Sequence, residues 1–108
     1  MYCRHVTLQV KDNWITEFPR VIENEVLPLL RRQKGFLDEI FLCIPEKKEA
    51  VAISLWETKE HAEVYHREFY PEVTKILNKY IEGTPMVKPF EVGFTTLPAF
   101  KKFAVSAN

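Results

Sequence analysis

Apolar and polar residues follow two different periods along this chain, and the changes between them mark six segments. Residues 2–10 alternate at every second position, which is typical of a half-buried strand. Residues 15–30 and 62–80 instead repeat apolar side chains every three to four positions, which predicts helices. Three further segments have the β-branched and aromatic composition of strands, namely 36–44, 49–56 and 86–97. The order β-α-β-β-α-β predicts an α+β, ferredoxin-like fold with a four-stranded antiparallel sheet.

Capping residues and prolines predict where the first helical segment begins and bends. Asp12 or Asn13 is expected to cap it, because these side chains accept hydrogen bonds from the free N–H groups of a first turn. Pro19 is suited to the start of the regular helix, and Pro28 is expected to kink it by removing one backbone hydrogen bond. Gly35 predicts a left-handed stop.

The second helical segment has its own signals. Thr58 is a helix cap, and Pro71 predicts a kink or two consecutive helices that meet near Tyr70. Residues 82–85 have the composition of a turn before the last strand. Pro89 predicts that this strand lies at an edge of the sheet or contains a bulge.

The central hairpin, residues 36–56, lacks a polar face. Strict alternation places Phe36, Ile40, Leu42 and Ile44 together with Asp38 on one face of its first strand, opposite a second set that comprises Leu37, Glu39, Phe41 and Cys43. Both faces therefore need cover, whereas two helices cover only one face of such a sheet. The simplest cover is a second copy, which predicts a homodimer through the sheet faces.

Composition limits the class of protein. The 108 residues suffice for a single domain, expected at 1–97 with a C-terminal tail at 98–108. The formal net charge is +0 and no basic stripe is present, so neither nucleic acid nor a membrane is an expected partner. Cys3 and Cys43 both fall inside strands and are expected to be buried, reduced thiols, which favours a cytoplasmic location.

Candidate chemistry rests on aromatic and ionisable side chains that face inward. His66 and Tyr65 lie on the apolar stripe of the second helical segment and are candidate catalytic residues, with a simple packing role as the alternative for each. Trp56, Phe69 and Arg4 are candidate substrate-binding residues. Core packing is the alternative for the two aromatic residues, and an ion pair with a carboxylate such as Asp38 is the alternative for Arg4. The sequence has no metal-ligand spacing and no glycine-rich phosphate loop, so no cofactor is expected.

Four short stretches occur in an order and spacing that resemble the antibiotic biosynthesis monooxygenase family. They are Leu27-Pro28-Leu29-Leu30, Gly35-Phe36-Leu37, Ala52-Ile53-Ser54-Leu55-Trp56-Glu57 and Phe69-Tyr70-Pro71-Glu72-Val73. The resemblance covers roughly residues 4 to 93. It implies a dimeric α+β barrel, in which two such sheets pack face to face and a pocket lies between sheet and helices. It also implies oxidation of a phenol or quinol by molecular oxygen, without metal or flavin.

The chain departs from that family at several functional positions. Counting from Trp56, it has Ala52, Ala62 and Ile76 where the polyketide oxygenases have Asn, Tyr and Arg. Relatives that degrade haem have a His where this chain has Lys75, which disfavours haem degradation. The sequence therefore favours a cofactor-independent monooxygenase acting on a small aromatic or quinol molecule. A non-catalytic small-molecule-binding or interaction module on the same barrel is the alternative.

Overall fold

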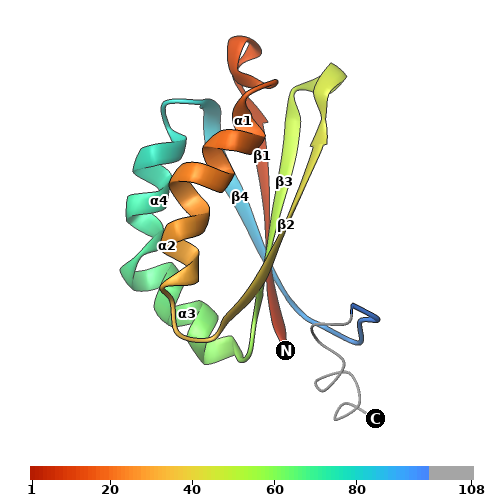
Figure 1. Cartoon of the computed structure of the whole chain (residues 1–108), viewed down its shortest axis with the longest axis vertical. Coiled ribbons are helices and arrows are strands. Elements are labelled where there is room, and N and C mark those ends of the chain that lie inside the picture. Colours follow the sequence, from red (N-terminus) through yellow and green to blue (C-terminus); the bar gives the residue numbers. More distant parts are fainter. Residues whose placement is uncertain (98–108) are drawn as a thin grey trace.

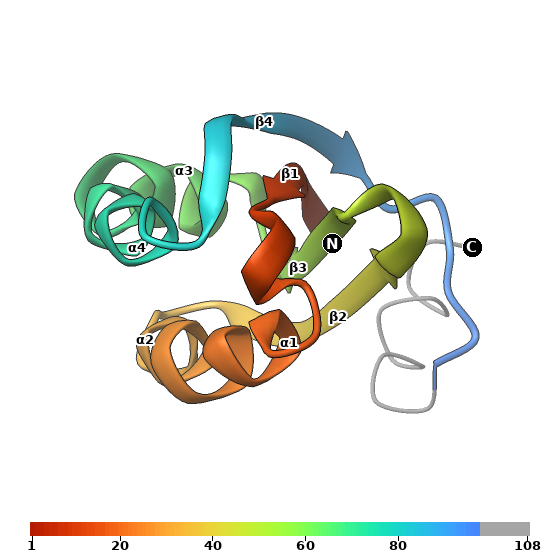
Figure 2. The same cartoon turned by 90° about the horizontal axis from the view of Figure 1, so that it is seen from above.

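The computed structural model describes residues 1–97, in which the α-helices all lie on one face of a four-stranded antiparallel sheet (Figures 1 and 2). The strands are β1 (Tyr2–Val10), β2 (Phe36–Ile44), β3 (Glu49–Trp56) and β4 (Ile81–Glu91), in the spatial order β2-β3-β1-β4. The main helices are α1 (Phe18–Val21), α2 (Leu27–Arg31), α3 (Lys59–Glu68) and α4 (Tyr70–Leu77). The predicted ferredoxin-like α+β fold is confirmed. The expected tail, 98–108, lies outside the described residues.

The first helical segment is broken into short turns rather than merely kinked. A 3-10 turn, Asp12–Trp14, precedes α1, and a π-helical turn, Ile22–Val26, separates α1 from α2. Both prolines lie in the first turn of a new helix, where the missing N–H has no intrahelical partner to lose. The prediction that Asp12 or Asn13 caps a helix is wrong, since neither of the first two turns has a side-chain cap. Asp12 instead forms an ion pair of 3.4 Å with Lys48.

The second helical segment follows its sequence signals. The Thr58 hydroxyl accepts a hydrogen bond of 3.2 Å from the backbone N–H of His61, as expected for a cap. The helix then divides into α3 and α4 at Phe69, two residues before Pro71. Gly35 has a φ of +84°, as predicted, and the imidazole of His61 occupies the space in which a Cβ would stand. These contacts fix the start of α3 against the loop that leads into β2.

A β-bulge near the start of β2 makes one sequence prediction wrong. The register passes from the pair Phe36–Trp56 to the pair Asp38–Leu55, which leaves Leu37 as the extra residue. Phe36 therefore faces the helices together with Phe41, while Leu37 packs on the opposite face with Cys3. Glu39 faces the helices together with Phe41, as strict alternation grouped them.

The last strand begins earlier and ends earlier than predicted. Residues 82–85, expected as a turn, belong to β4, and residues 92–97 lie beyond its end. A register shift between Thr7 and Gln9 accommodates this segment, in which Gly83 has a φ of +70°. Pro89 lies in an edge strand, as expected, because β4 pairs only with β1.

The main core lies between the sheet and the helices and includes the fully buried side chains of Trp56, Phe18, Leu8 and Val10. The prediction for the two thiols is half right. Cys3 is buried beside Leu55 on the sheet face that has no helices, whereas Cys43, near the end of the β2–β3 hairpin, is exposed. No described helix is both long and apolar enough to span a membrane.

Candidate functional site

A polar row crosses the three neighbouring strands β1, β3 and β2 on the face that the helices cover. Arg4 pairs with Ser54, and Ser54 pairs with Glu39. Adjacent strands lie about 4.8 Å apart, so Arg4 and Glu39 start from backbones about 10 Å apart with the small Ser54 between them. The next row contains Val6, Ala52 and Phe41. The small side chains of β3 leave a hollow above the middle of the sheet.

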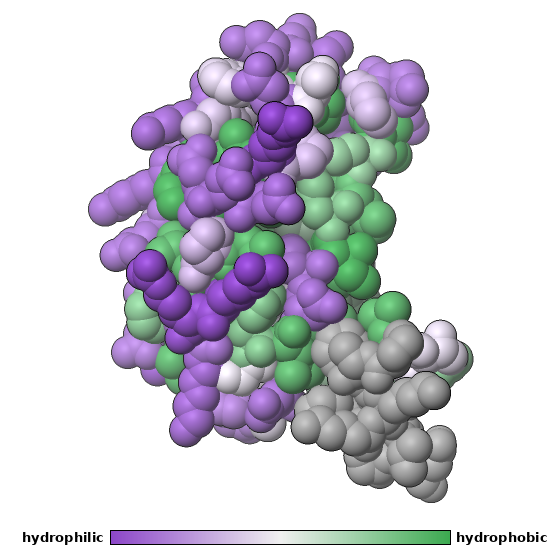
Figure 3. All heavy atoms as spheres, viewed as in Figure 1, coloured by the Kyte–Doolittle hydropathy of each residue, from purple (hydrophilic) through white to green (hydrophobic). Residues whose placement is uncertain are grey.

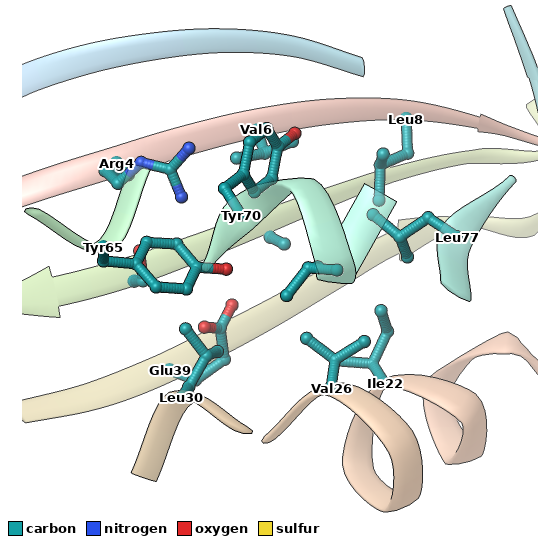
Figure 4. Close-up of a pocket in the computed structure, with 13 residues that line it drawn as sticks. Arg4, Val6, Leu8, Ile22, Val26, Leu30, Glu39, Tyr65, Tyr70 and Leu77 are labelled. Atoms are coloured by element: carbon teal, nitrogen blue, oxygen red, sulfur yellow. The ribbon is translucent and has the colours of Figure 1, made fainter. Parts of the chain in front are cut away.

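The helices close this hollow into a cavity, which we call the Arg4 cavity. Its polar lining consists of Arg4, Glu39, Ser54, Tyr65 and Tyr70, and apolar side chains such as Val26 and Leu77 line the rest. Figure 4 shows the Tyr65 hydroxyl and the Glu39 carboxylate directed into it. Its volume is about 30 Å³, enough for one or two water molecules.

Arg4 is a buried cation without a carboxylate partner. Only 5% of its surface is exposed, and none of the ion pairs between described residues includes it. Its guanidinium lies over two aromatic rings, with Cζ 4.9 Å from the ring centre of Tyr65 and 4.5 Å from that of Tyr70. The expected ion pair with Asp38 is wrong, because Asp38 pairs with Leu55, whose side chain lies on the opposite face of the sheet from Arg4. Since buried charges are normally paired, this arrangement suits an anionic ligand.

His66 is held by Arg4 in one tautomer. The Nη2 atom of Arg4 lies 2.9 Å from Nδ1 of His66, and because a guanidinium can only donate, Nδ1 must be the acceptor. Burial lowers the pKa of His66, and the positive charge of Arg4 lowers it further. The imidazole is therefore neutral at pH 7 and carries its proton on Nε2. Its ring stacks on Tyr70 at 5.3 Å. In this state His66 orients Arg4 and has no free lone pair for a substrate proton.

Glu39 is the ionisable group on the other side of the cavity. Burial raises the pKa of its carboxyl to about 8; Arg4 opposes this rise and Asp38 adds to it. Burial likewise raises the pKa of both Tyr65 and Tyr70 above the ordinary value, against the influence of Arg4. Both phenols are therefore neutral at pH 7. The Tyr70 hydroxyl is buried and has no hydrogen-bond partner among the described residues, so it can still bind a ligand.

Trp56 lies behind the cavity instead of lining it. It is fully buried, its indole N–H donates a 2.8 Å hydrogen bond to the Ser54 hydroxyl, and its ring lies 5.0 Å from that of Tyr65. The indole thus supports two side chains of the cavity from outside, and Ser54 keeps its own O–H as a donor.

Two surface grooves adjoin the Arg4 cavity and share side chains with it. The α1 groove, of about 300 Å³, is lined by Arg20, Glu23 and Phe41 among others and reaches Glu39. The α3 groove, of about 450 Å³, contains Phe69 and reaches Tyr65, and its remaining side chains are Arg32, Gln33, Lys34, His61 and Val64. Phe69, a predicted substrate-binding residue, is 39% exposed there and does not line the cavity.

Of the five predicted site residues, Arg4 and Tyr65 line the cavity. His66 is exposed on α3 and does not line it, but its ring contacts Arg4. Two lining residues that sequence reasoning did not select as site residues are Glu39 and Tyr70. Glu39 carries a usable signal, since it is a carboxylate on an otherwise apolar strand face. Among residues 1–97, no group of three or more His, Cys, Asp or Glu side chains is arranged to hold a metal ion.

Comparisons with known proteins identify the fold. No protein-family model matches the sequence. No curated protein matches it either. Among solved structures, a monooxygenase from the gene ActVA-Orf6 of Streptomyces coelicolor, in complex with the ligand nanaomycin D, superposes with a TM-score of 0.72. It is 18% identical, and the match covers 90% of this chain and 91% of that one.

Two further structures have the same architecture. The NE2512 protein of unknown function from Nitrosomonas europaea has a TM-score of 0.72 at 12% identity, over 90% of this chain and 93% of that one. A structure described as an antibiotic biosynthesis monooxygenase has a TM-score of 0.66 at 13% identity, over 85% and 98% of the two chains. The chain therefore has the fold of the antibiotic biosynthesis monooxygenases, as the residues that resemble that family indicated.

Proposed function

We propose that this protein is a cofactor-independent monooxygenase that oxidises a small phenol or quinol bound as its anion in the Arg4 cavity. The observation that carries the proposal is the buried, carboxylate-free Arg4 beside the unpartnered Tyr70 hydroxyl. A phenolate oxygen between these groups would receive a charged and a neutral hydrogen bond, while the apolar lining accepts the ring. The shared fold with a monooxygenase that binds nanaomycin D supports the same class of reaction.

The proposed reaction needs only the substrate's own electrons. The phenolate reduces dioxygen, one oxygen atom is added to a ring carbon, and the other leaves as water, so that a phenol with one free ring position becomes a quinone. Electrostatic stabilisation of the developing anion is the contribution of Arg4. His66 acts as a positioning residue, because it fixes the guanidinium through Nδ1.

Substrate binding requires the cavity to widen. A cavity of about 150 Å³ accepts benzene, whereas the Arg4 cavity measures about 30 Å³. Tyr65 is the side chain that the cavity shares with the α3 groove. We therefore assign the opening movement to Tyr65, and the aromatic side chain of Phe69 offers an apolar surface to the arriving ring.

The experiment is oxygen uptake with added 1-naphthol or hydroquinone. The wild-type protein is expected to consume oxygen, and Arg4→Met to lose on the order of 10²-fold in rate, the usual cost of removing an electrostatic contact to a developing anion. Arg20→Met, which changes an arginine of the α1 groove outside the cavity, is the matched control and should keep full activity. Wild-type protein that consumes no oxygen with any phenol tested would contradict the proposal.

A second candidate function is a binding module that holds a small molecule without transforming it. The small volume of the cavity favours it, as does the presence of Ala52, Ala62 and Ile76 where the resembled oxygenases have polar residues. A phenol that raises the melting temperature but is recovered unchanged under oxygen would establish this function and exclude the first.

We also propose that two chains pack through the sheet faces that carry no helices. Large apolar side chains are exposed on this face, including Leu42 at 51%, Met86 at 73% and Phe90 at 46%. Figure 3 shows apolar atoms gathered along the side of the molecule that the strands form. An exposed apolar surface of this kind marks an interaction site, and a second copy offers a complementary one. His5, at 6.1 Å from the Phe90 ring, would then lie in the interface.

A further inference from the structure

The position of Glu39 across the Arg4 cavity assigns it a role beyond lining. Glu39 and Arg4 lie in the same cross-strand row, separated by Ser54. Both side chains line the same cavity, which has room between them for a ligand oxygen. Glu39 also lines the α1 groove on the outer side. It is the only ionisable side chain common to the cavity and this groove among the described residues.

We propose that Glu39 takes the proton of the phenol that Arg4 binds and exchanges it with solvent through the α1 groove. The phenolic O–H bond breaks and an O–H bond forms on the carboxylate, without transfer of electrons. The negative charge moves from Glu39 to the ligand oxygen, and the cavity keeps the same total charge. This matters because a change of net charge in a poorly solvated site is costly, whereas an exchange between two anions that face one cation is not. The inference rests on the proposed phenol-binding site and adds the residue that ionises the substrate.

The other charged and titratable groups around Glu39 are compatible with this role. They are Arg4 on β1, Asp38 beside it on β2, Tyr65 on α3, Tyr70 on α4, and Arg20 and Glu23 in the α1 groove. Burial raises the pKa of Glu39 to about 8, so the carboxylate form predominates above this pH and is basic enough to compete for a phenolic proton. Burial holds both tyrosines in the neutral form, and Arg4 occupies the acceptor atom of His66. Glu39 is therefore the proton acceptor that this site provides.

The proposal fixes how many protons are released when a phenol binds. In the complex, the ligand is ionised and Glu39 carries the proton. At about pH 6.5, Glu39 is already protonated in the free protein, so a phenol with a pKa of about 10 must release about one proton to solvent. At about pH 9, the free carboxylate accepts that proton, and almost none is released. Glu39→Gln cannot accept it and should release about one proton at both pH values.

The experiment is anaerobic calorimetric titration with phenol in two buffers of different ionisation enthalpy, which counts protons without turnover. The protein variants are wild type, Glu39→Gln and the control Glu23→Gln, whose side chain lies in the α1 groove outside the cavity. Ultraviolet difference spectra report whether the bound phenol is ionised. Wild type and Glu23→Gln should show a bound phenolate and a proton release that falls from about one to about zero between pH 6.5 and pH 9.

Several outcomes would overturn the inference. They are a wild-type release of about one proton at pH 9, a bound phenol with the neutral spectrum, and a complete absence of saturable binding. If Glu39→Gln does not fold, the wild-type protein alone still tests the inference. Its proton release should fall to half near pH 8, and a release that does not change with pH would contradict the role of Glu39. If the proton release is as expected but the protein consumes no oxygen, the monooxygenase proposal alone is refuted. Oxygen uptake with one proton released at pH 9 would refute the role of Glu39 alone.

Discussion

Replacing Glu39 by Gln should change how the stability of the ligand-free protein depends on pH. Burial raises the pKa of this carboxyl from 4.5 to about 8. The folded protein therefore binds more protons than the unfolded chain between these two values, and the free energy of unfolding falls as the pH rises through this window. At about 1.4 kcal/mol per pKa unit, the upper bound for the loss is ~5 kcal/mol. Because the carboxylate keeps some contact with the α1 groove, we expect about 2–4 kcal/mol.

The assay is urea unfolding followed by tryptophan fluorescence at pH 5 and pH 8.5, at one fixed protein concentration because assembly also contributes to stability. The free energy of unfolding of Glu39→Gln, relative to that of wild type, should be about 2–4 kcal/mol higher at pH 8.5 than at pH 5, since glutamine does not ionise. Glu23→Gln, an exposed change in the α1 groove, should follow wild type at both. An equal difference between Glu39→Gln and wild type at pH 5 and pH 8.5 would refute the reasoning, because Glu39 would then ionise as freely as in the unfolded chain.

Three further changes test the fold, the support of the cavity and the assembly. Gly35→Ala should lower the free energy of unfolding by about 2–3 kcal/mol, because φ is positive and the new Cβ would meet the imidazole of His61. Gly83→Ala, where φ is also positive but the space is open, should cost only about 1 kcal/mol in the same urea assay. Ser54→Ala removes the acceptor of the buried Trp56 N–H and should lower the free energy of unfolding by about 1–3 kcal/mol. In a double-mutant cycle, the same change made in a Trp56→Phe chain should cost much less, because that chain has no indole N–H. Leu42→Lys should convert the proposed dimer to a monomer in sedimentation analysis, and a wild type that sediments as a monomer at micromolar concentration would contradict the sheet-face interface.

The local signals predicted most of the fold because each depends on a few neighbouring residues. Pro71 divided the second helical segment as expected, and Thr58 caps it. Gly35 adopts the left-handed conformation for which only glycine is well suited. The order of elements then sufficed for the sheet, because the β-α-β-β-α-β sequence specifies one common arrangement.

The site was harder to predict because it depends on registers between strands that are distant in sequence. The bulge at Leu37 has no clear local signal, yet it reverses which side chains of β2 face the helices near its start. Strict alternation therefore placed Phe36 and Leu37 on the wrong faces of the sheet. Glu39 gained importance only when the pairs Arg4–Ser54 and Ser54–Glu39 placed it opposite a buried cation.

Trp56 and Phe69 illustrate a second limit of sequence reasoning. Both are aromatic residues near the predicted pocket, and helical or strand period alone does not distinguish a side chain that lines a cavity from one that supports it. The hydrogen bond from Trp56 to Ser54 places the indole behind the cavity. The start of a new helix at Tyr70 leaves Phe69 at the junction of α3 and α4, on the outer groove.

The most direct test of the central claim is the ionisation state of a bound phenol and its dependence on Arg4. Anaerobic ultraviolet difference titration with 1-naphthol should show saturable binding with a naphtholate spectrum for wild type and for Arg20→Met. Arg4→Met, provided that its urea unfolding remains cooperative, should show neither. Binding of neutral 1-naphthol by wild type, or equal binding of the anion by Arg4→Met, would contradict the account.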